Sequence, residues 1–185
     1  NSTIKRVGVG PEIIVVSDSS RIIVEESDVI GEVVINNMAD LYYSNCIFDI
    51  EPEVNDAALF IEAFIDSIFI GENNLSLPIT GTLRTINGIM NLESISNYLI
   101  EFSQLDGSES QIISNTSFTE NIYESTLYAW DIGGIPTGEY LLSLSTFIDE
   151  ELQLTTSRNV IIDHFFYGDL NQDGVVNILD VVITV

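Results

Sequence analysis

The stretch Ile135-Pro-Thr-Gly-Glu-Tyr-Leu-Leu-Ser-Leu144 indicates most clearly which kind of fold this chain adopts. Pro136 fixes its φ angle and Gly138 supplies a permissive one, so the opening residues predict a tight turn. The residues after the turn alternate between two faces, with Tyr140, Leu142 and Leu144 on one and Glu139, Leu141 and Ser143 on the other. This period of two predicts a β-strand, and Leu141 on the outer face indicates packing on both sides or a contact between domains.

Runs of the same kind recur along the chain between turn-forming residues. They are short and rich in Ile, Val, Leu, Phe and Tyr, which is typical of β-sandwiches and not of alternating strands and helices. The sequence therefore predicts an all-β chain with strands at 12–16, 21–25, 31–36, 41–50, 97–103, 126–130, 139–147 and 152–162. Residues 56–69 show neither period, but their β-branched and aromatic content favours a buried strand.

The length of 185 residues allows one large or two small domains. Pro78 follows the turn residues Asn73 and Asn74, and proline interrupts strand pairing, so we expect a domain join there. The sequence thus predicts two tandem β-sandwich domains, at residues 1–77 and 78–163, followed by a distinct C-terminal segment at 164–185.

The layout of the second segment resembles a known family of modules. Its motifs are Pro78-Ile-Thr-Gly-Thr, Ser96-Asn-Tyr-Leu-Ile-Glu-Phe, Leu127-Tyr-Ala-Trp-Asp, the stretch 135–144 and Asn159-Val-Ile-Ile-Asp. Together they resemble the immunoglobulin-like or fibronectin-like accessory domains of secreted subtilisin-like peptidases. In the first segment, Gly31-Glu-Val-Val-Ile-Asn-Asn followed by Leu41-Tyr-Tyr is similar to the sandwich modules that often lie beside such domains.

The C-terminal segment contains Gly168-Asp-Leu-Asn-Gln-Asp-Gly-Val-Val-Asn-Ile-Leu-Asp180, in which oxygen-bearing side chains recur at short intervals. An EF-hand loop supplies calcium ligands from positions 1, 3, 5, 7, 9 and 12, with glycine at position 6 for the turn. With Asp169 at position 1, Gly174 falls at position 6 and Asp180 at position 12. This register predicts a Ca²⁺ site, because an ordinary Asx-rich turn would not need its Asp, Asn and Gly residues at these particular positions.

Aspartate stands at position 12 of this loop where the common pattern has glutamate, and an apolar helical stretch follows. With Gly168-Asp-Leu-Asn in front, the segment resembles one repeat of a type I dockerin, the calcium-binding module at the ends of many secreted bacterial proteins. The resemblance implies an EF-hand-like loop and the start of a helix. Its implied calcium ligands are Asp169, Asn171, Asp173, the Val175 carbonyl, Asn177 through a water, and Asp180.

The segment also departs from the dockerin pattern. A dockerin has two packed repeats, whereas this sequence has one, so we expect its apolar residues between 175 and 183 to need a covering surface. Ile178 and Leu179 stand where cohesin-binding dockerins often carry small hydroxyl residues. We therefore expect a protein partner or self-association, with a cohesin-like partner less favoured.

Acidic residues dominate the charge: 29 Asp and Glu stand against 5 Lys and Arg, a net charge of −24. This excludes nucleic acid as a partner, because binding it requires clustered Lys and Arg. Self-repulsion of this size destabilises a compact state unless salt or bound cations offset it, so we expect an extracellular or cell-surface location. The acidic clusters at 25–28 and 49–56 are interpreted as solvated surface rather than further cation sites, since their spacing matches no ligand template.

Cys46 is the single cysteine, so no intramolecular disulfide can form, and its strand-like surroundings indicate a buried, unreactive thiol. No stretch reaches the roughly 18 apolar residues of a membrane helix, so no membrane span is predicted. The sequence opens without methionine or a signal segment, which indicates a processed form or a piece of something longer.

Candidate catalytic groups are sparse. The only histidine, His164, stands alone, and no serine lies in a nucleophile-elbow pattern, so no enzyme is predicted. Nothing selects a pair of carboxylates for glycoside hydrolysis. The aromatic residues available as sugar platforms also fit a sandwich core, and for Trp130 the core is favoured. They are Tyr42, Tyr43, Tyr128, Trp130 and Tyr140.

Three functions remain open. The first is a non-catalytic, calcium-binding structural or docking region of a secreted or cell-surface bacterial protein. The second is a self-assembling subunit of an extracellular filament or surface layer stabilised by calcium, since open strand edges and apolar ends favour head-to-tail contacts. The third is a carbohydrate-binding or peptidase-accessory module.

Overall fold

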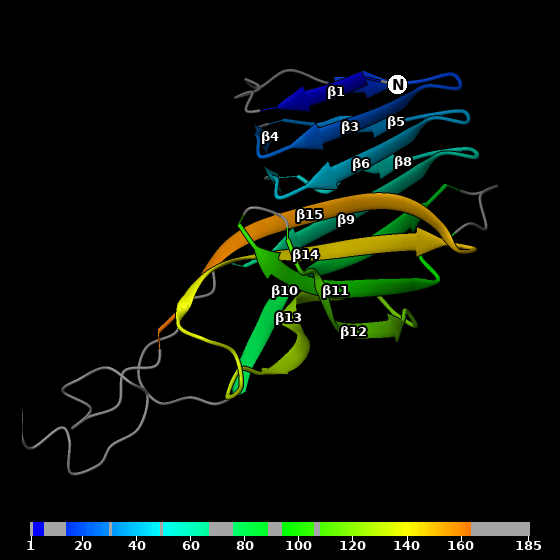
Figure 1. Ribbon diagram of the computed structural model, residues 1–185. Helices are drawn as coiled ribbons and strands as arrows, with labels where there is room; N and C mark the ends of the chain where they lie inside the picture. Colours follow the sequence, from blue (N-terminus) through cyan, green and yellow to red (C-terminus); the bar gives the residue numbers. More distant parts are fainter. Residues whose placement is uncertain are drawn as a thin grey trace, which may run out of the picture.

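A computed structural model describes residues 2–5, 14–29, 31–48, 50–66, 76–88, 94–105 and 108–163. All regular elements in these residues are strands, so the predicted all-β class is confirmed (Figure 1). The helix expected after the calcium loop lies outside the described residues. The strands are β1 (Ser2–Lys5), β2 (Ile14–Val16), β3 (Arg21–Glu25), β4 (Asp28–Val29), β5 (Val33–Ile35), β6 (Asp40–Ser44), β7 (Ile47–Phe48), β8 (Glu53–Val54), β9 (Leu59–Ile65), β10 (Ser76–Asn87), β11 (Asn97–Gln104), β12 (Gln111–Ser117), β13 (Ile122–Asp131), β14 (Gly138–Ile148) and β15 (Glu151–Ile162).

Strands β1 to β9 form stacked turns of a short parallel β-helix. Its three walls are β1-β3-β6-β9, β2-β5-β8 and β4-β7, and every pairing within them is parallel. A β-sandwich expected at residues 1–77 would be built from antiparallel neighbours, so this part of the expectation is corrected. Alternating apolar residues indicate strands, but they do not say which strands pair or in which direction.

The turns of the β-helix repeat every 19 residues, as the register Ile22–Leu41–Phe60 shows. One corner of each turn places Asp18, Asn37 or Asp56 at a φ of 64°, 62° or 56°. Asn and Asp tolerate this left-handed region better than other non-glycine residues, so the corner selects them. Beside this corner, the Asn55 side-chain amide donates to Asn36 Oδ1 at 3.1 Å, which bonds successive turns to each other.

Apolar side chains from the three walls fill the inside of the β-helix. The wall residues Val24, Leu41, Tyr43 and Phe60 meet Val16, Val33 and Ile35 from the second wall and Val29 from the third. Burial of this set is the main force that holds the turns together, because burying one large aliphatic side chain contributes roughly 1.5–3 kcal/mol.

The wall β1-β3-β6-β9 continues past the β-helix, because β10 pairs antiparallel with β9 and β13 with β10. A second sheet, β12-β11-β14-β15, packs on this extension and completes a two-layer sandwich with a shared core. Pro78 lies inside β10, so the expected boundary between residues 77 and 78 falls within a strand. The proline is tolerated there because β9 pairs with β10 only from Gly81 onward, which leaves one edge of β10 unpaired by β9 near Pro78.

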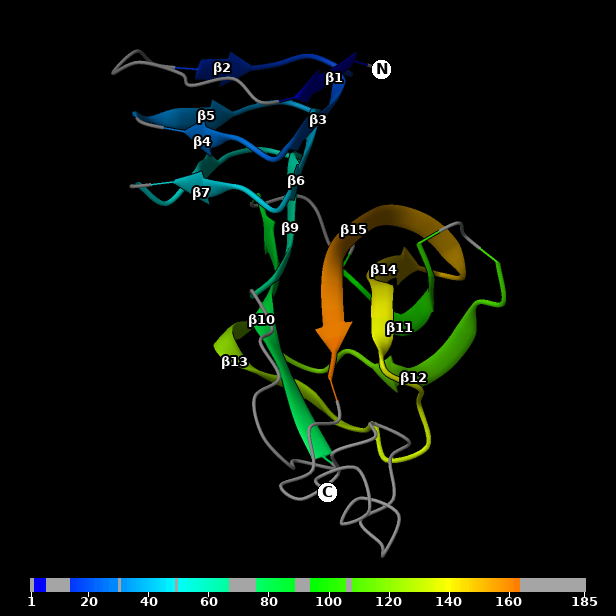
Figure 2. The same ribbon diagram turned by 60° about the vertical axis from the view of Figure 1, so that its left-hand side comes forward.

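Strand β9 belongs to both parts of the molecule. The structure confirms the prediction of a buried strand within residues 56–69, and Figure 2 shows that other strands lie on both sides of β9. The β-helix covers one face, where Phe60 packs, and strands β14 and β15 cover the other. The residues on that second face are Leu59, Ile61, Ala63 and Ile65.

Polar contacts also join the β-helix to the second sheet. The Arg21 guanidinium donates to the Gln153 carbonyl at 3.1 Å and lies over the Tyr42 ring at 4.3 Å. The Tyr42 hydroxyl donates to Gln153 Oε1 at 3.2 Å. Farther along, Asn45 Nδ2 donates to the Ser157 carbonyl at 3.0 Å, and Arg158 Nε donates to the Ile65 carbonyl at 3.2 Å. We call these contacts the seam.

Substitution of Gly81 by alanine is expected to destabilise the fold by about 2 kcal/mol or more, because overpacking distorts a close-packed site. A Cβ added at Gly81 would lie 2.1 Å from the Phe64 carbonyl oxygen of β9. Urea unfolding measures the change. Gly134→Ala is the matched control, since no atom lies within 4 Å of an added Cβ there. Equal stability of the two variants would contradict the close approach of β9 and β10.

Candidate functional site

The predicted calcium ligands Asp169, Asn171, Asp173, Val175, Asn177 and Asp180 lie outside the described residues, as does His164. The calcium site therefore stays a prediction. In the part of the chain that the structure describes, no group of three or more His, Cys, Asp or Glu side chains is arranged to hold a metal ion.

Three carboxylates of the acidic cluster at 49–56 have structural partners. Glu53 Oε1 accepts from Asn55 Nδ2 at 2.9 Å, and Asp56 Oδ2 accepts from the Asn37 backbone N–H at 3.3 Å. Glu51 pairs with Arg84 at 3.2 Å. These carboxylates thus stabilise the corners and the end of the β-helix.

The aromatic residues considered as sugar platforms divide into two groups. Tyr42, Tyr43, Trp130 and Tyr140 are buried, which confirms the core position predicted for Trp130. Tyr128 is 38% exposed, and Tyr123, which the sequence did not single out, is 54% exposed.

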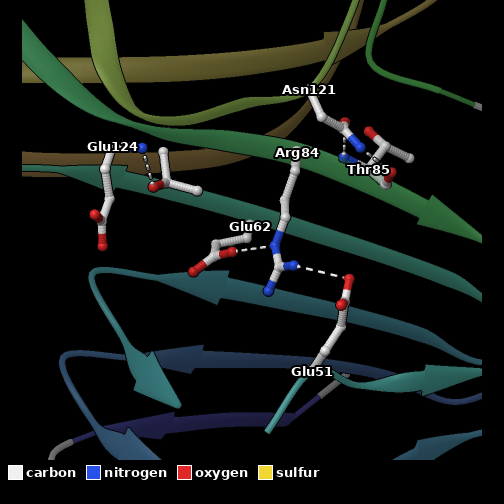
Figure 3. A network of polar contacts seen from close by, with 7 residues as sticks. Glu51, Glu62, Arg84, Thr85, Asn121 and Glu124 are labelled. Atoms are coloured by element: carbon white, nitrogen blue, oxygen red, sulfur yellow. Dashed lines mark hydrogen bonds and ion pairs between the residues drawn. The ribbon is translucent and has the colours of Figure 1, made fainter. Parts of the chain in front are cut away.

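Arg84 lies where the β-helix ends and the sandwich begins (Figure 3). Its Nε donates to Glu62 Oε2 on β9, and its Nη1 lies 3.2 Å from Glu51 Oε1 in the segment before β8. The side chains of Arg84 and Glu62 are 6% and 8% exposed, whereas that of Glu51 is 67% exposed. The guanidinium also lies 5.3 Å from the centre of the Phe60 ring. A buried ion pair with one solvated partner therefore closes this end of the β-helix.

Burial changes the acid–base properties of the groups around this ion pair. Burial raises the pKa of Glu62, and the charge and hydrogen bond of Arg84 oppose that rise. Burial likewise raises the pKa of the Cys46 thiol, which lies 3.3 Å from the carbonyl oxygens of Val24 and Ser44. A raised thiol pKa lowers the thiolate fraction, so Cys46 is buried, as predicted, and in an environment that disfavours reaction.

An open cleft of about 440 Å³ lies beside the ion pair. We call it the junction cleft, and its lining residues come from β9, the residue after it, β10, β13 and the connection between β6 and β7. They are Cys46, Glu62, Phe64, Asp66, Thr82, Arg84, Tyr123 and Glu124.

A second cleft of about 370 Å³ shares one lining residue, Tyr123, with the first. We call it the hydroxyl cleft, because Ser and Thr side chains make up much of its wall. Those residues are Thr116, Ser117, Thr119, Ser125 and Thr126, and they are joined by Asn121, Glu120 and the aromatic residues Tyr98 and Phe118.

Hydrogen bonds between side chains and backbone groups hold β13, the strand that carries Tyr123. The Asn121 side chain accepts from the Thr85 N–H at 2.9 Å and donates to the Thr85 carbonyl at 3.2 Å, which mimics a strand partner. The Glu124 N–H donates to the Thr82 hydroxyl at 3.1 Å (Figure 3). Two register shifts between β10 and β13 accompany these contacts, and Glu124 has a φ of 40°. Bulges of this kind often re-aim side chains next to functional sites.

Sequence reasoning missed the two clefts for a physical reason. Glu62 and Arg84 are 22 residues apart, and only the antiparallel pairing of β9 with β10 brings them together. One signal was available: Arg84 is a rare basic residue in an acidic chain and stands inside a strand-like apolar stretch. A buried arginine in such a place needs an acidic partner.

Comparison of the chain with family models and with curated proteins found no match. The functional argument therefore depends on the sequence patterns and on the geometry alone.

Replacement of Arg84 by methionine is expected to destabilise the protein by about 3–5 kcal/mol near neutral pH, because it leaves the buried Glu62 without its partner. The loss of stability caused by this substitution should become smaller toward acidic pH. Arg84 holds the pKa of Glu62 down, so its loss raises that pKa further above the ordinary value of 4.5. A raised folded-state pKa gives stability that is complete below the unfolded value and is lost as pH rises through the folded value.

Urea unfolding of wild type and R84M at several pH values measures this effect. Glu51→Gln is the control, since Glu51 is mostly exposed and should cost no more than about 1 kcal/mol. If the loss of unfolding free energy in R84M is the same at every pH, the loss does not arise from the unpaired Glu62 carboxylate.

Proposed function

We propose that this chain is a non-catalytic structural and docking region of a secreted or cell-surface bacterial protein. The observation that carries the proposal is that one strand, β9, is part of both the β-helix and the sandwich, with both of its faces buried. Two parts that share a strand buried on both faces cannot move independently without exposing apolar surface. Such a region serves to hold neighbouring segments at a fixed spacing.

The seam supports the same role. Arg21, Tyr42 and Gln153 lie on different strands and form a bonded cluster, and Asn45 and Arg158 add contacts to backbone carbonyls. A flexible pair of domains would have a small polar interface and an exposed linker. Here the β-helix and the sandwich meet along a continuous sheet.

The second part of the chain is best assigned to the immunoglobulin-like sandwiches. The Tyr140 hydroxyl, near the start of β14, donates to the Pro136 carbonyl at 2.9 Å. A tyrosine at this corner that bonds back to the preceding backbone is a hallmark of that class. The strand order also matches the Greek-key order of immunoglobulin-like sandwiches: β10 pairs with β13 in one sheet, and the other sheet has the order β12-β11-β14-β15. Accessory domains of secreted peptidases remain a related role.

We further propose that the segment after Asp163 binds calcium through Asp169, Asn171, Asp173, Val175, Asn177 and Asp180. Support comes from the register of these residues in an EF-hand-like loop. Binding of calcium to such an acidic loop is coupled to its folding, so the metal would order a docking end next to β15. A net charge of −24 is consistent with a location rich in salt or calcium. The described residues contain no helix of the length and apolar character needed to cross a membrane.

The single Trp130 and the single Cys46 provide a test of the shared fold. Trp130 is buried in the sandwich core and Cys46 inside the β-helix. Because β9 joins the two cores, we expect urea unfolding followed by Trp130 fluorescence to coincide with unfolding followed by thiol labelling of Cys46. Arg21→Ala should lower both midpoints together. Two separate transitions in the wild-type protein would contradict a single rigid unit.

Calcium binding has its own test. Asp173→Ala is expected to weaken Ca²⁺ binding about tenfold or more, measured by isothermal titration calorimetry, because it removes a central carboxylate ligand. Asp163→Ala is the matched control, since Asp163 is exposed, carries the same charge and precedes the loop.

Hydrogen exchange with and without a chelator then follows the coupling. Calcium should increase amide protection in residues 169–185 of the wild type and of the control, but not in the D173A variant. If chelation leaves the protection of these residues unchanged in the wild type, the calcium-binding docking role is wrong.

A further inference from the structure

Beyond the structural role, we propose that the junction cleft and the hydroxyl cleft together form a binding site for a neutral oligosaccharide, with Tyr123 between two subsites. Tyr123 lines both clefts. Their volumes of about 440 and 370 Å³ are within the range of small-molecule sites. In the proposed site, an extended ligand would place one sugar unit in each cleft, with Tyr123 between them.

Tyr123 has the properties of a sugar platform. Its side chain is 54% exposed, although large aromatic side chains are usually buried for their apolar area. The Arg84 guanidinium lies 5.6 Å from the centre of its ring and helps to hold the ring in place. The C–H groups on one side of a pyranose ring can pack on an exposed aromatic ring of this kind.

The walls of the hydroxyl cleft match the hydrogen-bonding needs of a sugar. Each sugar hydroxyl both donates and accepts, and Ser and Thr hydroxyls do the same. Five such residues and the Asn121 amide line this cleft, together with Tyr98 and Phe118. In the junction cleft, Asp66 and Glu124 can accept from sugar hydroxyls, and Thr82 can donate or accept. A purely apolar ligand would displace water from these polar groups without replacing its hydrogen bonds.

The charges of the site exclude an acidic ligand. The junction cleft contains three carboxylates, those of Glu62, Asp66 and Glu124, and one cation, Arg84. That cation is already paired with Glu62 and Glu51. A uronic acid or a phosphate would therefore meet net negative charge. A neutral sugar meets no such penalty.

The site is also built on a strained and well-held strand. Glu124 has a φ of 40°, which costs free energy for a residue other than glycine, and it lies next to Tyr123. The bond from its N–H to Thr82 and the Asn121–Thr85 pair maintain that conformation. Pre-organisation of this kind reduces the entropy lost when a ligand binds.

The proposal is tested with the full chain in calcium-containing buffer. Isothermal titration calorimetry with neutral hexasaccharides of glucose, xylose, mannose and N-acetylglucosamine is expected to give saturable binding to at least one of them. Tyr123→Ala should weaken that binding about tenfold, as expected for loss of aromatic stacking. Tyr128→Ala is the matched control, because Tyr128 lies on the same strand, is also exposed and lines neither cleft.

The substitution Glu124→Gln distinguishes a site for a neutral sugar from a site for a cation. It removes one negative charge from the junction cleft but keeps a hydrogen-bonding group, so sugar binding should weaken less than in Y123A, whereas binding of a cation should be lost. Binding of hexalysine that disappears in the E124Q variant or at high salt, without binding of any sugar, would overturn the proposal. No binding of any hexasaccharide at millimolar concentration, or equal loss in Y123A and Y128A, would also overturn it. The structural role does not depend on this result, because coincident unfolding of the two cores tests it separately.

Discussion

Burial of β9 on both faces is the constraint on which the rest of the structure depends. Ile61 and Ile65 require the second sheet above them, and Phe60 requires the interior of the β-helix below. Neither cover alone would remove the strand's apolar surface from water, and the cost of leaving it exposed is large compared with the net stability of a domain. The β-helix and the sandwich therefore stabilise each other, and the long sheet that joins them follows from this one strand.

The acidic composition makes the placement of the few basic residues informative. Arg21 and Arg158 lie in the seam, and Arg84 lies at the end of the β-helix, so three of the five basic residues are at the junction of the two parts. Mutual repulsion of the two acidic parts would be greatest where they meet. Cations at that place offset the repulsion and also bind backbone carbonyls, which a neutral apolar side chain could not do.

The same arrangement explains why clefts occur at the junction. The inner face of the long sheet is covered by the β-helix as far as β9, and beyond it β10 and β13 continue the sheet without that cover. On this face Thr82 is half-buried and Arg84 is buried, and both side chains line the junction cleft. Groups in such positions are held firmly yet remain within reach of a ligand.

The sequence predicted the strands better than their pairing. The strand at 21–25 was predicted with its observed bounds, and the strands near 97–103, 139–147 and 152–162 were predicted to within a few residues. Strand β10 was missed because Pro78 reads as an interruption, and proline is tolerated there only because β9 does not reach that part of the edge. The β-helix was not predicted, although Asp18, Asn37 and Asp56 recur every 19 residues. A single recurring corner residue is a weak signal for a repeat fold when the residues between the corners do not repeat as a motif.

The sequence by itself determined the all-β class and the burial of Trp130 and Cys46, and it predicts that nucleic acid is no partner and that residues 169–180 have the register of a calcium loop. Each of these depends on local alternation, spacing or composition, which a single chain displays directly. Only the tertiary structure decided that the first strands pair in parallel, that β9 is shared, and that Glu62, Arg84 and Tyr123 lie together. These features depend on contacts between residues far apart in the chain, and many pairings of the same strands would satisfy the same local pattern.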